Sequence, residues 1–461
     1  METNKSFLNA PLSAKIGHVS PMENNLKYFI FTFGCQMNKA DSERIAALLE
    51  KTGYEPAENE KDADLIVANM CSVRQSAVDR VLGFGKLFPE LKAKNPNLKT
   101  VLTGCVLIED FKKSGKLFDY VLPIKKLAKW PGYLKEENFS MPSDPFQKDC
   151  AYLELPPKHS SKASVYIPIS NGCNNFCAYC AVPYTRGPLV CRDFKDILIE
   201  AEQAVKNGAK EIWLLGQNVN DYFCDGVSFA KLIEVINDIP GDFWIRFASP
   251  HPQNFYDEMI TAVSRCKKVA PYISLPLQAG DDDTLKKMNR PYKVGGYRVL
   301  VNKLRKAFSS QRQGLEKELA LSTDVIVGFP GESKHQFNNT ARLMDEIKYD
   351  MAYIAQYSPR PGTHASRIPD NVSKVEKEKR WEHLTEILKK TALNKNKLFI
   401  GNTIEVLVDE QREGFLLGKS RHFKTVKIKI GKEAAEKNFI GQFVKADITE
   451  ALPWGLEGEL R

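Results

Sequence analysis

Hydrophobic positions in the first part of the chain alternate between two periods. Residues 27–34 (KYFIFTFG), 62–70 (DADLIVANM) and 100–104 (TVLTG) are rich in β-branched and aromatic side chains, which is typical of strands. SERIAALLEKTG at 42–53 instead spaces its apolar residues as a helix does and ends at a glycine. Strands that alternate with helices predict a parallel sheet, so we expect an open α/β domain over residues 26–140.

The middle of the chain, residues 165–392, repeats the strand-then-helix pattern six times. The expected strands are VYIPI (165–169), IWLLG (212–216), FWIRFAS (243–249), YISLPL (272–277), LSTDVIVG (321–328) and MAYIAQYS (351–358). Six such units with right-handed crossovers predict a partial (βα)6 barrel whose active site lies at the carboxyl ends of the strands. A charged helix is expected near 373–391, with a packing stripe of Trp381, Leu384, Ile387 and Leu388.

A different pattern begins near residue 396. Residues 402–430 alternate with period two and are punctuated by glycine, which predicts a small antiparallel β-barrel over 396–461. Residues 141–164 are rich in Pro, Ser and Lys, so we expect a linker there. Residues 1–25 lack the apolar core of a signal peptide, and we expect a flexible tail.

Charge adds a candidate partner. The 461 residues carry a net charge of +9, and eleven consecutive positions of the tail hold five basic residues and no acid: Lys419, Arg421, Lys424, Lys427 and Lys429. These residues form either a solvated strand face or, with Phe415 and Phe423 available to stack on bases, an RNA-binding face. No apolar stretch reaches the roughly 20 residues of a membrane span, so we expect a cytoplasmic protein without a membrane partner.

The strongest chemical signal is a cysteine cluster in SNGCNNFCAYC (170–180). It places Cys173, Cys177 and Cys180 in one loop directly after the first strand of the middle segment. A structural zinc site needs four ligands, and Cys191 is the obvious candidate for a fourth. Three thiolates on a cubane iron–sulfur cluster instead leave one iron open for chemistry, which is the interpretation that we favour.

A second cysteine triad is spread over the first domain. Cys35, Cys71 and Cys105 each follow the end of a predicted strand. Because ligands of open parallel sheets bind outside the carboxyl ends of the strands, we expect these three thiols to meet at one edge. The alternative is three separate buried core thiols.

Cys-X3-Cys-X2-Cys with an aromatic residue, Tyr179, before the last cysteine resembles the motif of the radical S-adenosylmethionine superfamily. The order of cysteine triad, βα segment and basic β-rich tail is similar to that of its methylthiotransferases. The resemblance implies two 4Fe–4S clusters. The cluster on the loop triad would bind and cleave S-adenosylmethionine, and the auxiliary cluster on the first triad would carry sulfur. It also implies that the tail is a TRAM-like domain that binds tRNA.

Three further segments, GCQMN (34–38), NMCSVR (69–74) and LLGQNVN (214–220), resemble the MiaB type of methylthiotransferase. That type adds a methylthio group to C2 of N6-dimethylallyladenosine beside the tRNA anticodon. The resemblance places around the cosubstrate Tyr179, Gly216, Gln217, Ser249, Gln278, Val325 and Gly328. Three departures from the usual pattern are Met70, where a threonine is usual, Cys191, where a serine is typical, and Ser274, where a histidine is common.

The resemblance further implies two molecules of S-adenosylmethionine per turnover. Expected partners are the tRNA anticodon stem-loop, an electron donor such as flavodoxin or ferredoxin, and a sulfur-delivery system, and the expected state is a monomer. Two other functions remain open at this point. One is a sister methylthiotransferase that acts on threonylcarbamoyladenosine or on a ribosomal protein; the other is a non-catalytic, metal-containing RNA-binding protein.

Overall fold

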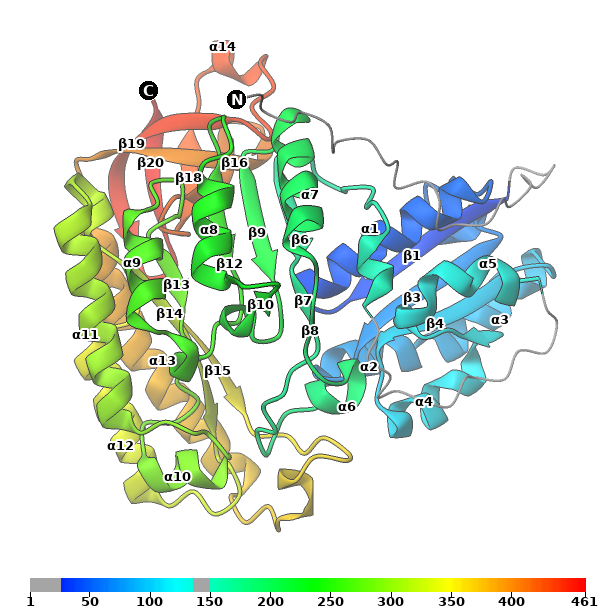
Figure 1. The fold of residues 1–461 in the computed structure, drawn as a ribbon, viewed down its shortest axis with the longest axis horizontal. Helices are drawn as coiled ribbons and strands as arrows, with labels where there is room; N and C mark the ends of the chain where they lie inside the picture. The colour runs from blue at the N-terminus through cyan, green and yellow to red at the C-terminus, as the bar shows by residue number, and fades with distance from the viewer. Residues whose placement is uncertain (1–25, 136–149) are drawn as a thin grey trace, which may run out of the picture.

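The computed structural model describes residues 26–135 and 150–461. Figure 1 shows an N-terminal sheet domain (blue to cyan) beside a central core (green to yellow), with a small barrel (orange to red) packed on the core. The expected tail at 1–25 and the first part of the expected linker, 141–149, lie outside the described residues. Within the described ranges, no helix combines the length and apolarity needed to cross a bilayer.

The N-terminal domain is the expected open parallel sheet, in the order β2-β1-β3-β4-β5. Its strands are β1 (Lys27–Phe33), β2 (Glu55–Pro56), β3 (Leu65–Cys71), β4 (Lys99–Cys105) and β5 (Tyr120–Val121). Its helices are α1 (Gln36–Lys51), α2 (Gln75–Leu82), α3 (Phe84–Lys94), α4 (Ile108–Ser114) and α5 (Trp130–Tyr133). The central strand β3 is buried at every position, as its continuous apolar run requires.

The core contains the six expected strands, arranged as two parallel sheets of three. One has the order β12-β9-β6 and the other β13-β14-β15. Their bounds are β6 (Ser164–Pro168), β9 (Glu211–Leu215), β12 (Trp244–Phe247), β13 (Tyr272–Ser274), β14 (Ala320–Val327) and β15 (Met351–Gln356). A bridge between Ile245 and Val269 lies between the sheets, and one hydrophobic core runs across both.

Helices cover the outside of these sheets (Figure 1). The longer ones are α7 (Phe194–Lys206), α8 (Phe229–Asn237), α9 (Asp257–Arg265), α11 (Val294–Gln311), α12 (Lys334–Ile347) and α13 (Lys374–Asn396). Shorter elements are β7 (Ser170–Asn171), α6 (Val182–Arg186), β8 (Val190–Cys191), β10 (Phe223–Cys224), β11 (Val227–Ser228) and α10 (Asp282–Lys287). The predicted stripe of α13 is buried at Leu384 and Leu388, but Trp381 remains partly exposed.

The C-terminal strands close into a barrel, in the order β16-β17-β18-β20-β19. They are β16 (Thr403–Arg412), β17 (Phe415–Ser420), β18 (Thr425–Lys429), β19 (Phe443–Leu452) and β20 (Gly455–Leu460), with the short helix α14 (Lys432–Ala435) before β19. Four of its five strand pairs are antiparallel, as predicted, but β18 and β20 pair in parallel to close it.

The barrel docks on the core through a buried arginine. Arg246 of β12 forms an ion pair with Glu211 at 2.5 Å and donates hydrogen bonds to the carbonyls of Ser420 and Arg421. Its guanidinium also lies over the rings of Trp213, Trp244, Tyr272 and Phe423, at 5.0–5.8 Å from their centroids. Aromatic faces attract a desolvated cation, so this box joins the two domains.

The described part of the expected linker is packed rather than loose. Residues Ala151–Glu154 form a short 3-10 helix whose Tyr152 and Leu153 are buried in the same hydrophobic cluster as α1. The composition of this segment pointed to a loop, but two apolar side chains are enough to anchor it between the N-terminal domain and the core.

Candidate active site

The loop that carries the first cysteine triad is fixed at its base by a glycine. Gly172 has φ +85°, and a Cβ there would lie 2.1 Å from the carbonyl oxygen of Pro188. Its amide donates to Gln217 Oε1 at 2.5 Å, and the next amide, of Cys173, donates to the carbonyl of Gly187 at 3.1 Å. Only glycine fits this position without a clash, so the start of the loop is set by its backbone.

The three thiols of this loop lie in a shielded environment. Cys173 and Cys177 are buried, and burial raises the pKa of Cys173 and raises that of Cys180 to about 12. Arg290 Nη1 donates to Cys177 Sγ at 3.3 Å. Thiolates in such a place need positive charge beside them, which metal ions and a guanidinium supply.

The second triad forms at the carboxyl edge of the N-terminal sheet, as predicted. Cys71 and Cys105 are register partners at the ends of β3 and β4, and Cys35 stands at the N-terminus of α1 after β1. A hydrogen bond with Cys105 lowers the pKa of Cys71 to about 6, and it raises the pKa of Cys105. The charge of Cys35 also raises the pKa of Cys105, so all three thiols interact.

The donor sets suit an iron–sulfur cluster. In the described residues no three His, Cys, Asp or Glu side chains converge tightly enough for one metal ion. The thiolates of a cubane bind separate irons, so a triad too open for a single metal ion is still compatible with a cluster. In both triads a buried guanidinium N–H points at one sulfur, Arg186 at Cys105 and Arg290 at Cys177, and such donors stabilise an anionic cluster.

Cys191, the candidate fourth ligand of a zinc site, lies in the β7–β8 pair opposite Ser170. Burial raises the pKa of its thiol, and the backbone N–H of Phe223 and the carboxylate of Asp221 also act on it. Asp221 lies between β9 and β10, and Phe223 begins β10.

The residues expected around the cosubstrate occupy the carboxyl ends of the core strands. Ser249, Gln278 and Gly328, which follow β12, β13 and β14, all have φ between +58° and +69°. Positive φ is uncommon for residues other than glycine and concentrates at functional sites. Tyr179, Gln278 and Val325 line one cleft together with Cys180.

The other expected cosubstrate residues are not among those that line this cleft. A Cβ at Gly216 would meet Ser170 Oγ at 2.7 Å, and Gln217 holds the amide of Gly172. Gly328 packs against the side chain of Lys377. A Cβ added at Gly328 would lie 2.4 Å from Lys377 Cγ. These three residues support the loop and the strand ends.

The cleft has a volume of about 860 Å³ and is lined by all three parts of the chain. Val73, two residues after Cys71, comes from the N-terminal domain, and Trp454 comes from the β19–β20 turn of the barrel. Tyr353 of β15 (55% exposed) and Trp381 of α13 (36%) add aromatic surface, as does Trp454 (47%). Sequence reasoning missed Tyr353 and Trp454 and assigned Trp381 to packing.

A carboxyl group also lines the cleft. Asp324 lies on β14, and burial raises its pKa to about 6, against the opposing charges of Arg290 and Arg74. At neutral pH this wall therefore presents a poorly solvated carboxylate next to apolar surface.

Two of the five basic residues predicted to bind RNA pair with acids of the core. Lys424 is buried and pairs with Asp350 of the core at 2.6 Å, and Arg421 pairs with Glu316 at 2.6 Å. Lys419 donates to Thr425 and lies over Phe423. These contacts place all three at or beside the interface between barrel and core.

Lys427 and Lys429 do project away from the buried Val426 and Ile428, as predicted. Their register partners on β20 are Glu457 and Glu459, so acids that are distant in sequence lie beside them. Phe415 stacks under Lys427, at 5.2 Å from its amine. This face of the barrel is therefore less basic than the sequence of β18 alone indicates.

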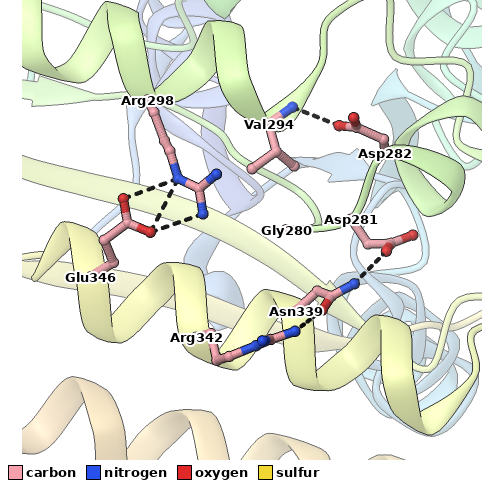
Figure 2. A pocket seen from close by; sticks show the side chains of 8 residues that line it. All are labelled: Gly280, Asp281, Asp282, Val294, Arg298, Asn339, Arg342 and Glu346. Atoms are coloured by element: carbon pink, nitrogen blue, oxygen red, sulfur yellow. Dashed lines mark hydrogen bonds and ion pairs between the residues drawn. The ribbon is translucent and has the colours of Figure 1, made fainter.

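A second hollow, shown in Figure 2, lies between α10, α11 and α12. Arg298 forms a two-pronged contact with Glu346, and Asn339 donates to Asp281. Its polar side chains satisfy one another, and none of the predicted site residues lines it, so we regard it as a seam between helices.

Two family models match separate segments of the chain. The model of Uncharacterized protein family UPF0004 matches residues 27–122, and the model of the Radical SAM superfamily matches residues 167–344. The radical S-adenosylmethionine methyltransferase TsrM from Kitasatospora setae superposes with a TM-score of 0.55 over 74% of this chain and 77% of that one, at 12% identity. This likeness shows a shared fold.

Curated relatives match almost the whole chain. A tRNA-2-methylthio-N(6)-dimethylallyladenosine synthase from Thermoanaerobacter pseudethanolicus is 38% identical over 95% of this chain and 93% of its own length. One from Clostridium botulinum (strain Langeland) is 38% identical over 94% and 96%. With this identity over nearly its full length, the chain belongs to the tRNA-2-methylthio-N(6)-dimethylallyladenosine synthase family of the radical S-adenosylmethionine superfamily.

Proposed function

We propose that the protein transfers a methylthio group to C2 of N6-dimethylallyladenosine in tRNA, as the names of its relatives state for them. The observation that carries the proposal is the cleft. It begins beside Cys71 at Val73, contains Cys180, and is walled by the barrel at Trp454. A substrate held there reaches the surroundings of both triads at once.

Each triad has a separate task in this proposal. Cys173, Cys177 and Cys180 would hold the 4Fe–4S cluster that, with S-adenosylmethionine, supplies the radical chemistry needed at an unactivated C–H bond. Cys35, Cys71 and Cys105 would hold the auxiliary 4Fe–4S cluster that carries the sulfur. Two molecules of S-adenosylmethionine would be used per turnover.

The cosubstrate residues divide into two groups. Tyr179, Gln278 and Val325 line the cleft beside Cys180 and would contact S-adenosylmethionine. Gly216, Gln217, Ser249 and Gly328 would hold the loop and the strand ends in position around it. Fixing the reactants in one cleft contributes orientation to the reaction.

The lining of the cleft favours an apolar substituent on the adenine. Tyr353, Trp381 and Trp454 offer flat apolar surface for a base and a dimethylallyl group. The charged residues of the lining, Asp324 and Arg360, have opposite signs, so the preference rests on the aromatic surface. This surface favours the proposed substrate over threonylcarbamoyladenosine.

The remaining assignments follow from the family. We assign the sulfur-cluster domain to residues 26–140, a (βα)6-type radical domain to 165–392 and a TRAM-like domain to 396–461. Lys427 and Lys429, with Lys419 beside them, would contact the backbone of the anticodon stem-loop, while Arg421 and Lys424 hold the barrel in place. The protein would be a cytoplasmic monomer. It would receive electrons from a reductant such as flavodoxin or ferredoxin and sulfur from a sulfur-delivery system.

Iron and sulfide analysis of anaerobically reconstituted protein tests the two-cluster arrangement. The wild type should bind about eight irons, and alanine at either set of three cysteines should leave about four. A total of about four irons in the wild type, or one zinc, would refute it. In vitro assays on tRNA bearing dimethylallyladenosine or threonylcarbamoyladenosine then test the substrate; product only from the second would identify a sister enzyme.

A further inference from the structure

One arginine of the radical domain reaches into the sulfur-cluster site. Arg186 ends α6, six residues after Cys180, and only 3% of it is exposed. Its Nε donates to Cys105 Sγ at 2.7 Å and its Nη2 to Asp41 Oδ2 at 2.7 Å. The contact with Cys105 spans 81 residues of sequence and joins the last turn of α6 to the end of β4.

The same side chain is tied to the start of the radical loop. Its Nη1 donates to Asn171 Oδ1 at 3.1 Å, and Asn171 Nδ2 donates back to the carbonyl of Arg186 at 3.2 Å. Asn171 lies two residues before Cys173. Tyr152 completes the network: it accepts from Nη1 at 3.2 Å and donates to Asp41 Oδ1 at 3.1 Å. The network thus contacts residues next to both triads.

The charges in this network are arranged around the sulfur. Among the described residues, Asp41 supplies the only carboxylate that forms an ion pair with the guanidinium, and both groups are buried. A purely structural ion pair would turn the fork of two N–H groups onto the carboxylate. Here the Nε–H is directed at Cys105 instead, and an N–H donated to a ligating sulfur stabilises the more negative, reduced state of a cluster.

We propose that Arg186 is a positioning residue that raises the reduction potential of the auxiliary cluster and holds that cluster in fixed register with the radical loop. The inference rests on the proposed function, because it requires a cluster on Cys35, Cys71 and Cys105. Arg290 has the corresponding contact in the other triad, through Cys177, and is therefore the matched control.

Potentiometric titration followed by electron paramagnetic resonance tests the role. The full-length chain with Cys173, Cys177 and Cys180 changed to Ala carries the auxiliary site alone. In that background, Arg186→Lys keeps the buried charge but loses the fork geometry. We expect the reduction potential of the auxiliary cluster to fall by at least 59 mV relative to the background variant, which is a tenfold change in a one-electron equilibrium constant. Arg290→Lys should leave this potential unchanged.

Asp41→Asn should shift the reduction potential of the auxiliary cluster in the opposite direction. It removes the negative charge but keeps the shape, so the guanidinium is less neutralised and the potential should rise. A merely structural network would not produce opposite shifts from its two partners. If the background variant binds no iron, both the proposed function and this inference are wrong. If it binds about four irons and the potentials of Arg186→Lys and Asp41→Asn match the parent, the role of Arg186 alone is refuted.

Discussion

Replacing Asp324 by Asn removes a carboxyl group that the folded chain keeps protonated to an unusually high pH. Burial beside the cleft raises its pKa from 3.8 to about 6. The unfolded chain has no such burial, so its pKa stays near the ordinary value. Asparagine has nearly the same shape and no charge, so the substitution isolates the electrostatic contribution of this residue.

The raised pKa determines how the free energy of unfolding changes with pH. Below pH about 3 both states hold the proton, so the carboxyl group contributes no penalty. As pH rises from about 4 to about 6 the unfolded state releases the proton first, and the free energy of unfolding of the wild type falls. At about 1.36 kcal/mol per pKa unit the penalty is at most about 3 kcal/mol, and about 1–3 kcal/mol once water access to the cleft is considered.

Denaturant unfolding of the metal-free chain under argon, followed by tryptophan fluorescence, measures this difference. Asp324→Asn should be more stable than the wild type at pH 8 by about 1–3 kcal/mol, and the gain should vanish toward pH about 3. Glu58→Gln, which removes an exposed carboxylate, controls for the loss of one negative charge. An equal gain at both pH values, or none at pH 8, would show that the carboxyl group is not desolvated.

Three further changes probe other parts of the account. Cys71→Ala should lose about four irons and all methylthiolated product while cleavage of S-adenosylmethionine persists; loss of cleavage with the radical cluster intact would contradict separate tasks. Arg246→Met should lower the free energy of unfolding by about 3–5 kcal/mol because it strands the buried Glu211, and adding Glu211→Gln should recover part of it in thermal denaturation. Lys427→Gln with Lys429→Gln should weaken tRNA binding and reduce the slope of log affinity against log salt by about 1–2; an unchanged slope would place the RNA elsewhere.

The two triads could be predicted because each depends on local pattern and simple topology. Strand periodicity located β1, β3 and β4, and a parallel sheet brings the residues after its strands to one edge. Cys71 and Cys105 are indeed register partners. The loop triad needed only its own spacing, and Gly172 before it is explained by the positive φ of that position.

Contacts between domains could not be predicted in the same way. Arg186 reaches Cys105 and Lys424 reaches Asp350 only because the domains dock as they do, and no local period encodes docking. The acids beside Lys427 arise from the parallel closure of β18 on β20, which an alternating pattern does not distinguish from antiparallel pairing. Trp454 lies in a turn, where a single aromatic residue carries no sign of the cleft it reaches.

Nucleoside mass spectrometry of tRNA tests the central claim most directly. In cells that lack this gene, N6-dimethylallyladenosine should accumulate and its 2-methylthio derivative should be absent. Return of the wild-type chain should restore the derivative, whereas chains with Cys71→Ala or Cys177→Ala should not. Unchanged levels of the derivative in the deletion strain, or a loss confined to methylthiolated threonylcarbamoyladenosine, would contradict the proposed function.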